Sequence, residues 1–161
     1  MLYFSLIYSR ILYAIEVYAN TYITYLHDLI ILNNRLLRII QHKPYNINTS
    51  DLYKSFNTLP VNKLFQFQLL IHAHTINFRP SLLPSIFSLN YQINKNIHSH
   101  DTRSSNDFHR TSTSSVFSTK ISSNLCAKLW NSLPINLKSE YSIHTFKGLL
   151  KDYLTIDDMK V

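Results

Sequence analysis

The sequence predicts a mainly α-helical protein whose helical segments are joined by a polar, irregular or partly extended connector. Long stretches place apolar residues at the spacing of one helix face, and prolines stand beside these stretches rather than inside them. Residues 89–123 are instead rich in Ser, Asn, Thr and His, and the apolar spacing fades there. We therefore expect a helical region over residues 1–88, a polar connector over 89–123 and a C-terminal helical region over 124–161.

The first predicted helix runs from about Tyr3 to Tyr18 and is apolar on nearly every side, which indicates a buried core helix. Arg10 and Glu16 interrupt it, and no run of about 18 uncharged apolar residues is present, so we expect no membrane partner. The stretch shows neither the basic leader nor the small-residue cleavage site of a signal peptide. Cys126 is the single cysteine, which favours an intracellular compartment, with nucleus and cytoplasm both open.

The second predicted helix runs from about Thr24 to His42. Its apolar residues repeat at helical spacing on one face: Leu26, Leu29, Ile30, Leu37 and Ile40. Arg35, Arg38 and His42 stand at positions i, i+3 and i+7, so they share a neighbouring stripe of the helix. Lys43-Pro44 ends the helix because the residue before proline avoids the helical conformation.

Two further helices are expected before the connector. The polar turn Asn46–Ser50 precedes a short helix, which Thr49 or Ser50 caps and which continues through Phe56. Pro60 opens a long helix over Val61–Phe78, and Arg79-Pro80 ends it. Much of the circumference of this long helix is apolar, through Leu64, Phe67, Leu70, Ile71 and Phe78.

The last predicted helices lie at about Asn124–Asn131 and Ile143–Leu154, and Ser142 is the expected N-cap of the second one. Gly148 lies inside that final helix, where it costs about 1 kcal/mol relative to alanine. Lys147 and Lys151 lie outside an apolar stripe that consists of Ile143, Phe146, Leu149, Leu150, Tyr153 and Leu154.

Carboxylates and nucleophiles do not form a recognisable catalytic set. Asp157-Asp158 is the only adjacent carboxylate pair, and no third carboxylate stands on an upstream strand, so we expect a solvated tail rather than a two-metal centre. Cys126 has no sequence context that activates a thiol, and no serine stands in a glycine-flanked elbow. We therefore expect no enzyme activity from this chain.

The histidines and the single glycine lead to the same expectation for metals and cofactors. His72 and His74 lie on opposite faces of a helix, and His98 and His100 share a face only in a strand. No carboxylate or cysteine completes either pair at a known ligand spacing. A glycine-rich phosphate loop is excluded because Gly148 is the only glycine. We expect no metal, no cofactor and no small-molecule ligand.

The net charge of +7, with an isoelectric point near 9.5, is typical of proteins with a polyanionic partner such as nucleic acid. Candidate phosphate contacts are Arg35, Arg38, Lys43, Arg103 and Arg110. Candidate rings for stacking on bases are Tyr91, Phe108 and Phe117. The same residues fit a solvated basic surface without such a partner, and both interpretations stay open at this point.

Short motifs stand in a fixed order along almost the whole chain. They are Tyr3–Ile15, Asn20-Thr21-Tyr22, Leu32-Asn33-Asn34-Arg35-Leu36-Leu37-Arg38-Ile39-Ile40, Leu52-Tyr53, Asn57-Thr58-Leu59-Pro60, His98-Ser99-His100-Asp101-Thr102-Arg103-Ser104-Ser105, Trp130-Asn131-Ser132-Leu133-Pro134 and Phe146–Leu154. In this order and with these gaps, the motifs resemble the region that follows the catalytic domain in non-LTR (LINE-type, jockey-like) retrotransposon reverse transcriptases.

The resemblance implies a non-catalytic C-terminal fragment of an RNA-directed DNA polymerase, without the polymerase palm and endonuclease that lie upstream in the family. The start of the chain inside a predicted helix, at Leu2-Tyr3-Phe4, also favours a piece of a longer protein. In the family context, this region is expected to hold RNA template or target DNA beside the palm through non-specific phosphate contacts.

For that role we expect Arg35, Arg38 and Arg103 to matter most, followed by Lys43, Arg110, Lys147 and Lys151. Trp130 is expected in the core rather than against a base. The alternative is a helical protein-interaction or structural module with no nucleic-acid role, whose apolar helices only pack against a partner.

Overall fold

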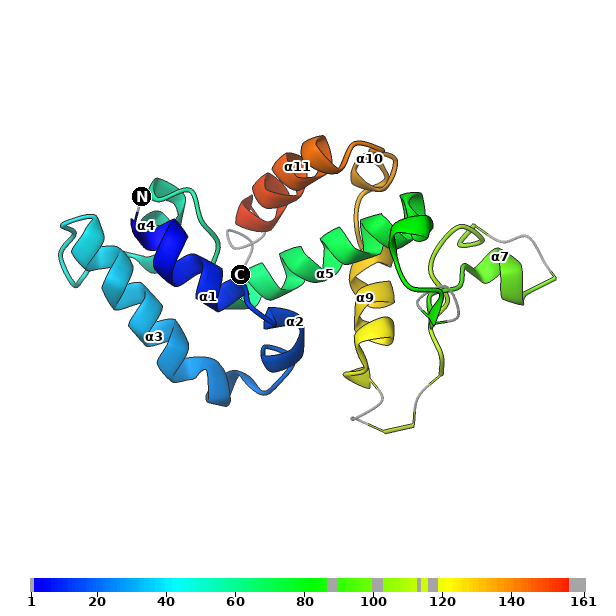
Figure 1. Ribbon diagram of the computed structural model, residues 1–161, viewed down its shortest axis with the longest axis horizontal. Coiled ribbons are helices and arrows are strands. Elements are labelled where there is room, and N and C mark those ends of the chain that lie inside the picture. Colours follow the sequence, from blue (N-terminus) through cyan, green and yellow to red (C-terminus); the bar gives the residue numbers. More distant parts are fainter. Residues whose placement is uncertain (1, 87–89, 100–102, 113, 116–118, 157–161) are drawn as a thin grey trace. The chain divides into compact units, whose positions relative to one another are not determined.

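A computed structural model describes residues 2–86, 90–99, 103–112, 114–115 and 119–156 (Figure 1). It is mainly helical, as the sequence predicts, with loops between the helices. The chain forms two compact units: the first consists of the described residues of 1–67 and 151–161, and the second of those of 68–150. The division into three regions that composition suggests stays a prediction. No helix in the described ranges is both long and apolar enough to cross a bilayer.

The helices follow one another as η1 (Tyr3–Tyr8, a π-helix), α1 (Ser9–Leu12), α2 (Ile15–Tyr18), α3 (Ile23–Ile40), α4 (Thr49–Ser55), α5 (Val61–Phe78), η2 (Pro80–Leu82, a 3-10 turn), α7 (Asn94–Ile97), α9 (Ser122–Asn131), α10 (Ile135–Lys138) and α11 (Ile143–Ile156). The long helix α5 begins and ends at the predicted residues. The N-cap role of Ser142 is also confirmed, since its hydroxyl accepts a hydrogen bond from the backbone N–H of Thr145.

The prediction of one continuous helix over Tyr3–Tyr18 is wrong. The helix α1 ends at Leu12, because Tyr13 takes an extended backbone and Ala14 takes a left-handed one with φ of 53°. The hydroxyl of Tyr18 then donates to the carbonyl oxygen of Ile11, which a continuous helix would use for its own ladder. The chain therefore turns between α1 and α2 at a point that apolar spacing does not mark.

The expectation that this segment is buried on every side is also wrong. Tyr3, Ile11 and Ile15 are buried, and they face the interior of the first unit. Several other large apolar side chains of the segment are exposed: Leu2, Phe4, Leu6, Tyr13 and Val17. The N-terminal helices therefore bury one side and expose the other, and the exposed side also carries apolar residues.

The helix α3 buries a polar residue at the centre of its inner face. Leu26 and Leu37 are buried as predicted, whereas Ile40, at the last position of the helix, is exposed. Asn33 is only 1% exposed, although the apolar pattern did not include it. A buried amide is stable in such a place only if its hydrogen-bonding groups find partners.

Two tyrosines supply these partners for Asn33. The hydroxyl of Tyr3 donates to Asn33 Oδ1 at 3.0 Å, and Asn33 Nδ2 donates to the hydroxyl of Tyr53 at 3.0 Å. The hydroxyl of Tyr53 in turn donates to Asn34 Oδ1 at 2.6 Å. Tyr3, Tyr53, Leu37 and Leu52 form one buried cluster, and burial raises the pKa of Tyr53 to about 12. The network ties η1, α3 and α4 together.

The helix α4 has a different N-cap from the one that the sequence predicts, whereas its C-terminal end, with Phe56 as the C-cap, agrees with the prediction to within one residue. Asn48, rather than Thr49 or Ser50, is the N-cap, because its side chain accepts from the backbone N–H of Ser50 at 3.2 Å. Asn57 takes the left-handed conformation that closes the other end. Lys151 donates its ammonium to the carbonyl oxygen of Asn57 and is half-buried, a contact that the sequence did not predict.

The second unit has an aromatic core around Trp130, which is 3% exposed, as predicted for a core residue. The ring centroid of Trp130 lies 5.9 Å from that of Phe146. His74 stacks on the other side of the cluster, 4.5 Å from the Phe146 ring, and its Nε2–H donates to the backbone carbonyl of Glu140 at 2.8 Å. In contrast, Leu149, which was predicted in the apolar stripe of α11, is exposed.

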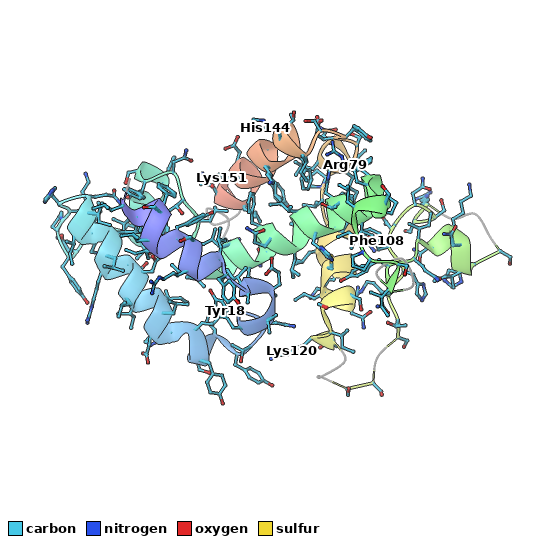
Figure 2. All side chains as sticks on the ribbon, in the orientation of Figure 1. Tyr18, Arg79, Phe108, Lys120, His144 and Lys151 are labelled. Atoms are coloured by element: carbon cyan, nitrogen blue, oxygen red, sulfur yellow. The ribbon has the colours of Figure 1, made fainter. Side chains whose placement is uncertain are left out.

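Part of the polar connector is fixed to this core by Asn131. The side chain of Asn131 accepts from the backbone N–H of Phe108 at 3.0 Å and donates to its carbonyl at 2.9 Å. Phe108, which is labelled in Figure 2, lies on the segment between α7 and α9. Its ring packs against Trp130, and an isolated antiparallel bridge joins it to Ile93. The neighbouring pair Trp130-Asn131 therefore has a structural role in this chain.

Candidate nucleic-acid interface

A hollow of about 590 Å³ lies at the C-terminal end of α3. It is lined by the side chains of Arg35, Arg38, Ile39, His42, Lys43 and Tyr45. No carboxylate of the described residues lies in this lining. The structure therefore brings three of the predicted phosphate contacts, Arg35, Arg38 and Lys43, to one place, which we call the basic hollow.

The end of α3 explains why these side chains meet. Arg35 and Arg38 are three residues apart on a helix and project from the same side. After the helix, His42 adopts a left-handed conformation with φ of 51°, and the backbone N–H of Lys43 reaches back to the carbonyl of Arg38 at 2.9 Å. This reversal returns Lys43 and Tyr45 to the side of the helix that carries the arginines.

The guanidinium of Arg38 lies over the ring of Tyr45, 5.2 Å from its centroid. Tyr45 itself is 80% exposed. The Nε atom of Arg38 is buried and has no hydrogen-bond partner among the described residues. Arg38 is thus held by packing and a ring contact, and no carboxylate among the described side chains neutralises its charge.

The charge balance at the basic hollow favours an anion. Within the described part of the chain, the side chains of Arg35, Arg38 and Lys43 form no hydrogen bond and pair with no carboxylate. The C-terminal end of a helix carries a partial negative charge of about half a unit, which basic residues commonly offset. Three unit positive charges exceed that requirement several-fold, so the hollow keeps a clear positive excess.

The other predicted phosphate contacts do not line this hollow. Arg103 and Arg110 are exposed on the segment between α7 and α9, and Lys147 is exposed on α11; all three belong to the second unit. Lys151 belongs to the first unit, but its ammonium is already bound to the carbonyl of Asn57, and burial lowers its pKa. A phosphate role for these four residues stays a prediction.

The aromatic side chains that sequence analysis proposed for base stacking lie elsewhere. Phe108 is 3% exposed and offers no free ring face, so that expectation is wrong for it. Tyr91 is half-buried with its ring against Phe108 and His72, and burial raises its pKa to about 12. Phe117 lies outside the described residues. Tyr45, the aromatic residue of the basic hollow, was missed, although it follows the basic stripe and Pro44 directly in the sequence.

Other chemistry in the described ranges is limited. No three or more His, Cys, Asp or Glu side chains in those ranges gather as a metal-binding group. Asp157-Asp158 and His100 lie outside the described residues. Cys126 is buried, which raises its pKa to about 12, and its thiol contacts the carbonyl of Leu69 at 3.4 Å. The thiol is therefore protonated at neutral pH.

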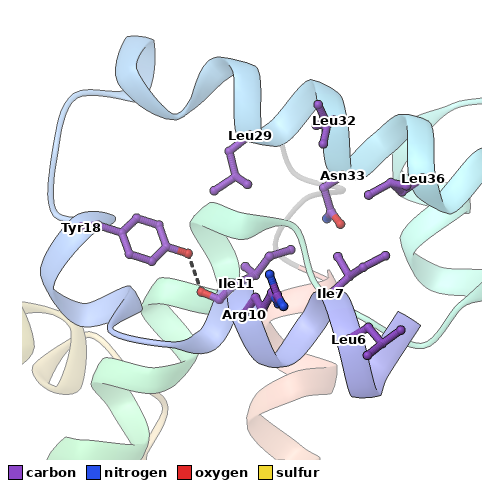
Figure 3. A pocket seen from close by; sticks show the side chains of 9 residues that line it. All are labelled: Leu6, Ile7, Arg10, Ile11, Tyr18, Leu29, Leu32, Asn33 and Leu36. Atoms are coloured by element: carbon purple, nitrogen blue, oxygen red, sulfur yellow. Dashed lines mark hydrogen bonds between the residues drawn. The ribbon is translucent and has the colours of Figure 1, made fainter. Parts of the chain in front are cut away.

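A second hollow, of about 550 Å³, lies between the N-terminal helices and α3 in the first unit (Figure 3). Its lining is mostly aliphatic, and it contains one charged side chain, Arg10. The lining residues are Leu6, Ile7, Arg10, Ile11, Tyr18, Leu29, Leu32, Asn33 and Leu36. The polar groups of Tyr18 and Asn33 are engaged within the protein, which leaves Arg10 as the polar group able to meet a ligand. We call this site the apolar groove.

Comparison with models of protein families, with curated proteins and with solved structures finds no match to this chain. The two hollows and their chemistry are therefore the basis for a functional proposal.

Proposed function

We propose that the chain is a non-catalytic nucleic-acid-binding region, which contacts the phosphates of RNA or DNA through the basic hollow at the end of α3. The observation that carries this proposal is the gathering of Arg35, Arg38 and Lys43, none of which pairs with a carboxylate of the residues that the structure describes. Contacts of this kind supply affinity without sequence choice. The order of the sequence motifs, which resembles that of non-LTR reverse transcriptases, supports a place for this region beside a polymerase core.

Salt-dependent binding tests the proposal. Each phosphate that the protein neutralises adds about 0.7 to the salt slope on single strands and about 0.9 on duplexes. Arg35→Gln with Lys43→Gln changes two exposed side chains, and we expect it to reduce the slope by about 1.4 on single strands. The slope is measured by fluorescence anisotropy of a labelled oligonucleotide over a range of salt concentrations.

The control is a variant with the same change of net charge at another place. Lys54→Gln with Lys128→Gln also removes two exposed charges, but neither lysine lines the basic hollow. We expect this variant to keep nearly the slope of the wild type. An equal loss in both variants would mean that binding depends on net charge alone, and the site would be wrong. Primer extension with Mg²⁺ by the purified chain would contradict the non-catalytic part of the proposal.

The apolar groove favours a second candidate function, a helical protein-interaction module. Its six aliphatic side chains accept the apolar face of an amphipathic helix. Arg10 forms no ion pair within the described ranges, so the occupant that fits is a helix with an acidic side chain at one end of its apolar face. A second copy of this chain fits less well, because two chains of charge +7 repel each other.

A pair of synthetic amphipathic helices tests this alternative. Both carry leucines on one face, and they differ only by a glutamate or a lysine at the end of that face. We expect tighter binding of the glutamate peptide, loss of this preference in Arg10→Gln, and loss of binding in Leu32→Glu. Equal binding of both peptides, or no binding, would remove the groove as a candidate, and nucleic-acid binding should be unaffected by either substitution.

A further inference from the structure

We infer that the basic hollow selects single-stranded nucleic acid, with one base stacked on the ring of Tyr45. This inference rests on the proposed function and names its substrate class. Phosphate contacts alone give no preference for a single strand, because a duplex also presents phosphates, and at a higher charge density. The choice must therefore come from a group that reaches the bases.

Tyr45 is placed to be that group. Its side chain lines the same hollow as Arg35, Arg38 and Lys43, so a strand that lies along these cations passes next to the ring. The ring is 80% exposed and makes no contact with another ring of the described residues. A single exposed tyrosine is ordinary on a protein surface. Its position among three cations that pair with no carboxylate in the described ranges is what indicates a nucleic-acid role.

Arg38 makes the ring of Tyr45 better suited to stack with a base. Its guanidinium lies over Tyr45 at 5.2 Å from the centroid, which restricts the ring before any ligand arrives. The positive charge of Arg38 also attracts the phosphate of the nucleotide whose base stacks on the ring. Stacking of a base on an aromatic side chain depends little on the identity of the base, because every base has a π-face. The inferred site is therefore tolerant of sequence.

A duplex cannot use the ring in this way, because its bases are already stacked on one another and paired inside the helix. Separating them costs a few kcal/mol for each base that is exposed. A single strand offers its bases at little cost. We therefore expect Tyr45 to strengthen binding of single strands and to contribute almost nothing to binding of duplexes.

An oligonucleotide without bases separates stacking from charge. We compare four labelled probes of equal length by fluorescence anisotropy: a single-stranded oligouridylate, a single-stranded oligothymidylate, an abasic strand and a DNA duplex. Tyr45→Ala should weaken binding of the two base-bearing single strands by roughly 5- to 150-fold, the range that stacking of one base supplies. Affinity for the abasic strand and the duplex should change by less than about 2-fold, and the salt slope should stay the same.

Two further variants guard against an indirect effect. Tyr45→Trp keeps a stacking ring and should bind single strands at least as tightly as the wild type. Tyr25→Ala removes another exposed tyrosine, on α3 but outside the hollow, and should have no effect. If Tyr45→Ala weakens the abasic strand as much as the base-bearing strands, Tyr45 acts by holding Arg38, and the inference fails. If no probe binds in a salt-dependent way, the proposed function itself fails.

Discussion

At the scale of single residues, Asn33 and His74 are polar side chains that lie almost fully buried. Neither residue belongs to the apolar face that the sequence predicts for its helix. Their partners come from distant parts of the chain, namely Tyr3 and Tyr53 for Asn33 and the carbonyl of Glu140 for His74. Sequence spacing cannot show a contact between segments that only the fold brings together. Both residues therefore lead to predictions that depend on the structure.

Replacement of Asn33 by leucine should destabilise the first unit. The substitution leaves the buried hydroxyl of Tyr3 without its acceptor, and an unsatisfied buried polar group costs about 1–3 kcal/mol. The free energy of unfolding is measured by urea titration. Addition of Tyr3→Phe to Asn33→Leu removes the stranded hydroxyl and should recover part of the loss. If the double variant is as unstable as the sum of the two single variants, the hydrogen bond is not the cause.

His74 should make the stability of the chain depend on pH. Burial lowers its pKa, the nearby charge of Arg79 acts in the same direction, and Nδ1 has no acceptor among the described residues for a second proton. The unfolded chain binds that proton with the ordinary pKa of about 6.5. The unfolded state therefore takes up more protons as the pH falls below about 6.5, and the free energy of unfolding decreases there.

Urea unfolding at about pH 7.5 and about pH 5 measures this difference in the wild type and in His74→Gln. Glutamine keeps an N–H donor for the carbonyl of Glu140 but does not titrate, so we expect a smaller loss of stability at low pH in this variant. The exposed His144 provides the matched control, His144→Gln, which should retain the wild-type dependence. The same pH dependence in all three proteins would contradict the role of His74.

At the scale of helices and turns, the sequence predicts what depends on local spacing. The bounds of α5 follow from its apolar residues and from Pro60 and Pro80, which stand just beyond its ends. The break at Ala14 is not predictable in this way, because alanine favours helix and nothing in the local pattern requires a turn. Likewise, Lys151 occupies an outward position by spacing, but the carbonyl of Asn57 binds it.

Three described residues that are not glycine have a positive φ, whereas the single glycine of the chain lies in a helix, where its conformational freedom is not needed. Ala14, His42 and Asn57 all have positive φ, where glycine is free of the steric cost of about 1–2 kcal/mol that other residues meet. Gly148, in contrast, lies in the exposed part of α11, and nothing lies within 4 Å of the position that a Cβ would take. Sequence composition alone gives no sign of this mismatch.

Two opposite substitutions should therefore both stabilise the protein. Ala14→Gly relieves a left-handed alanine, and we expect a gain of about 0.5–1 kcal/mol after the larger entropy of the unfolded glycine is subtracted. Gly148→Ala fills open space on a helix and should gain about 1 kcal/mol. Both gains are measured by urea unfolding. A loss of stability in Ala14→Gly would show that the turn between α1 and α2 does not require a left-handed residue.

At the scale of the whole molecule, the positive charge of the sequence predicts a polyanionic partner but does not show where it binds. Three of the seven predicted phosphate contacts line one hollow, and the reversal of the chain at His42 brings Lys43 and Tyr45 there. The stripe of Arg35 and Arg38 was predictable because helix geometry alone sets it. Tyr45 was not, because its place depends on a turn that contains no glycine and on a ring contact that spacing does not encode.

The effect of nucleic acid on thermal stability distinguishes an arranged site from net charge. The unfolded chain carries the same +7 as the folded one, so a partner that responds to net charge alone binds both states and leaves the melting temperature nearly unchanged. A partner that needs Arg35, Arg38, Lys43 and Tyr45 side by side binds the folded state more tightly. At a concentration of about 100 times Kd it adds up to about 2.7 kcal/mol of stability.

For a chain of this size, each kcal/mol raises the melting temperature by about 2–4 °C, so oligouridylate should raise it by roughly 5–10 °C at low salt. The increase should disappear at high salt and should be smaller in Tyr45→Ala and in Arg35→Gln with Lys43→Gln, whereas Lys54→Gln with Lys128→Gln should keep it. Differential scanning fluorimetry measures all four proteins. If anisotropy detects binding but the melting temperature of the wild type does not change, the unfolded chain binds the strand as tightly as the folded chain does. The folded arrangement at the end of α3 then contributes nothing to the affinity.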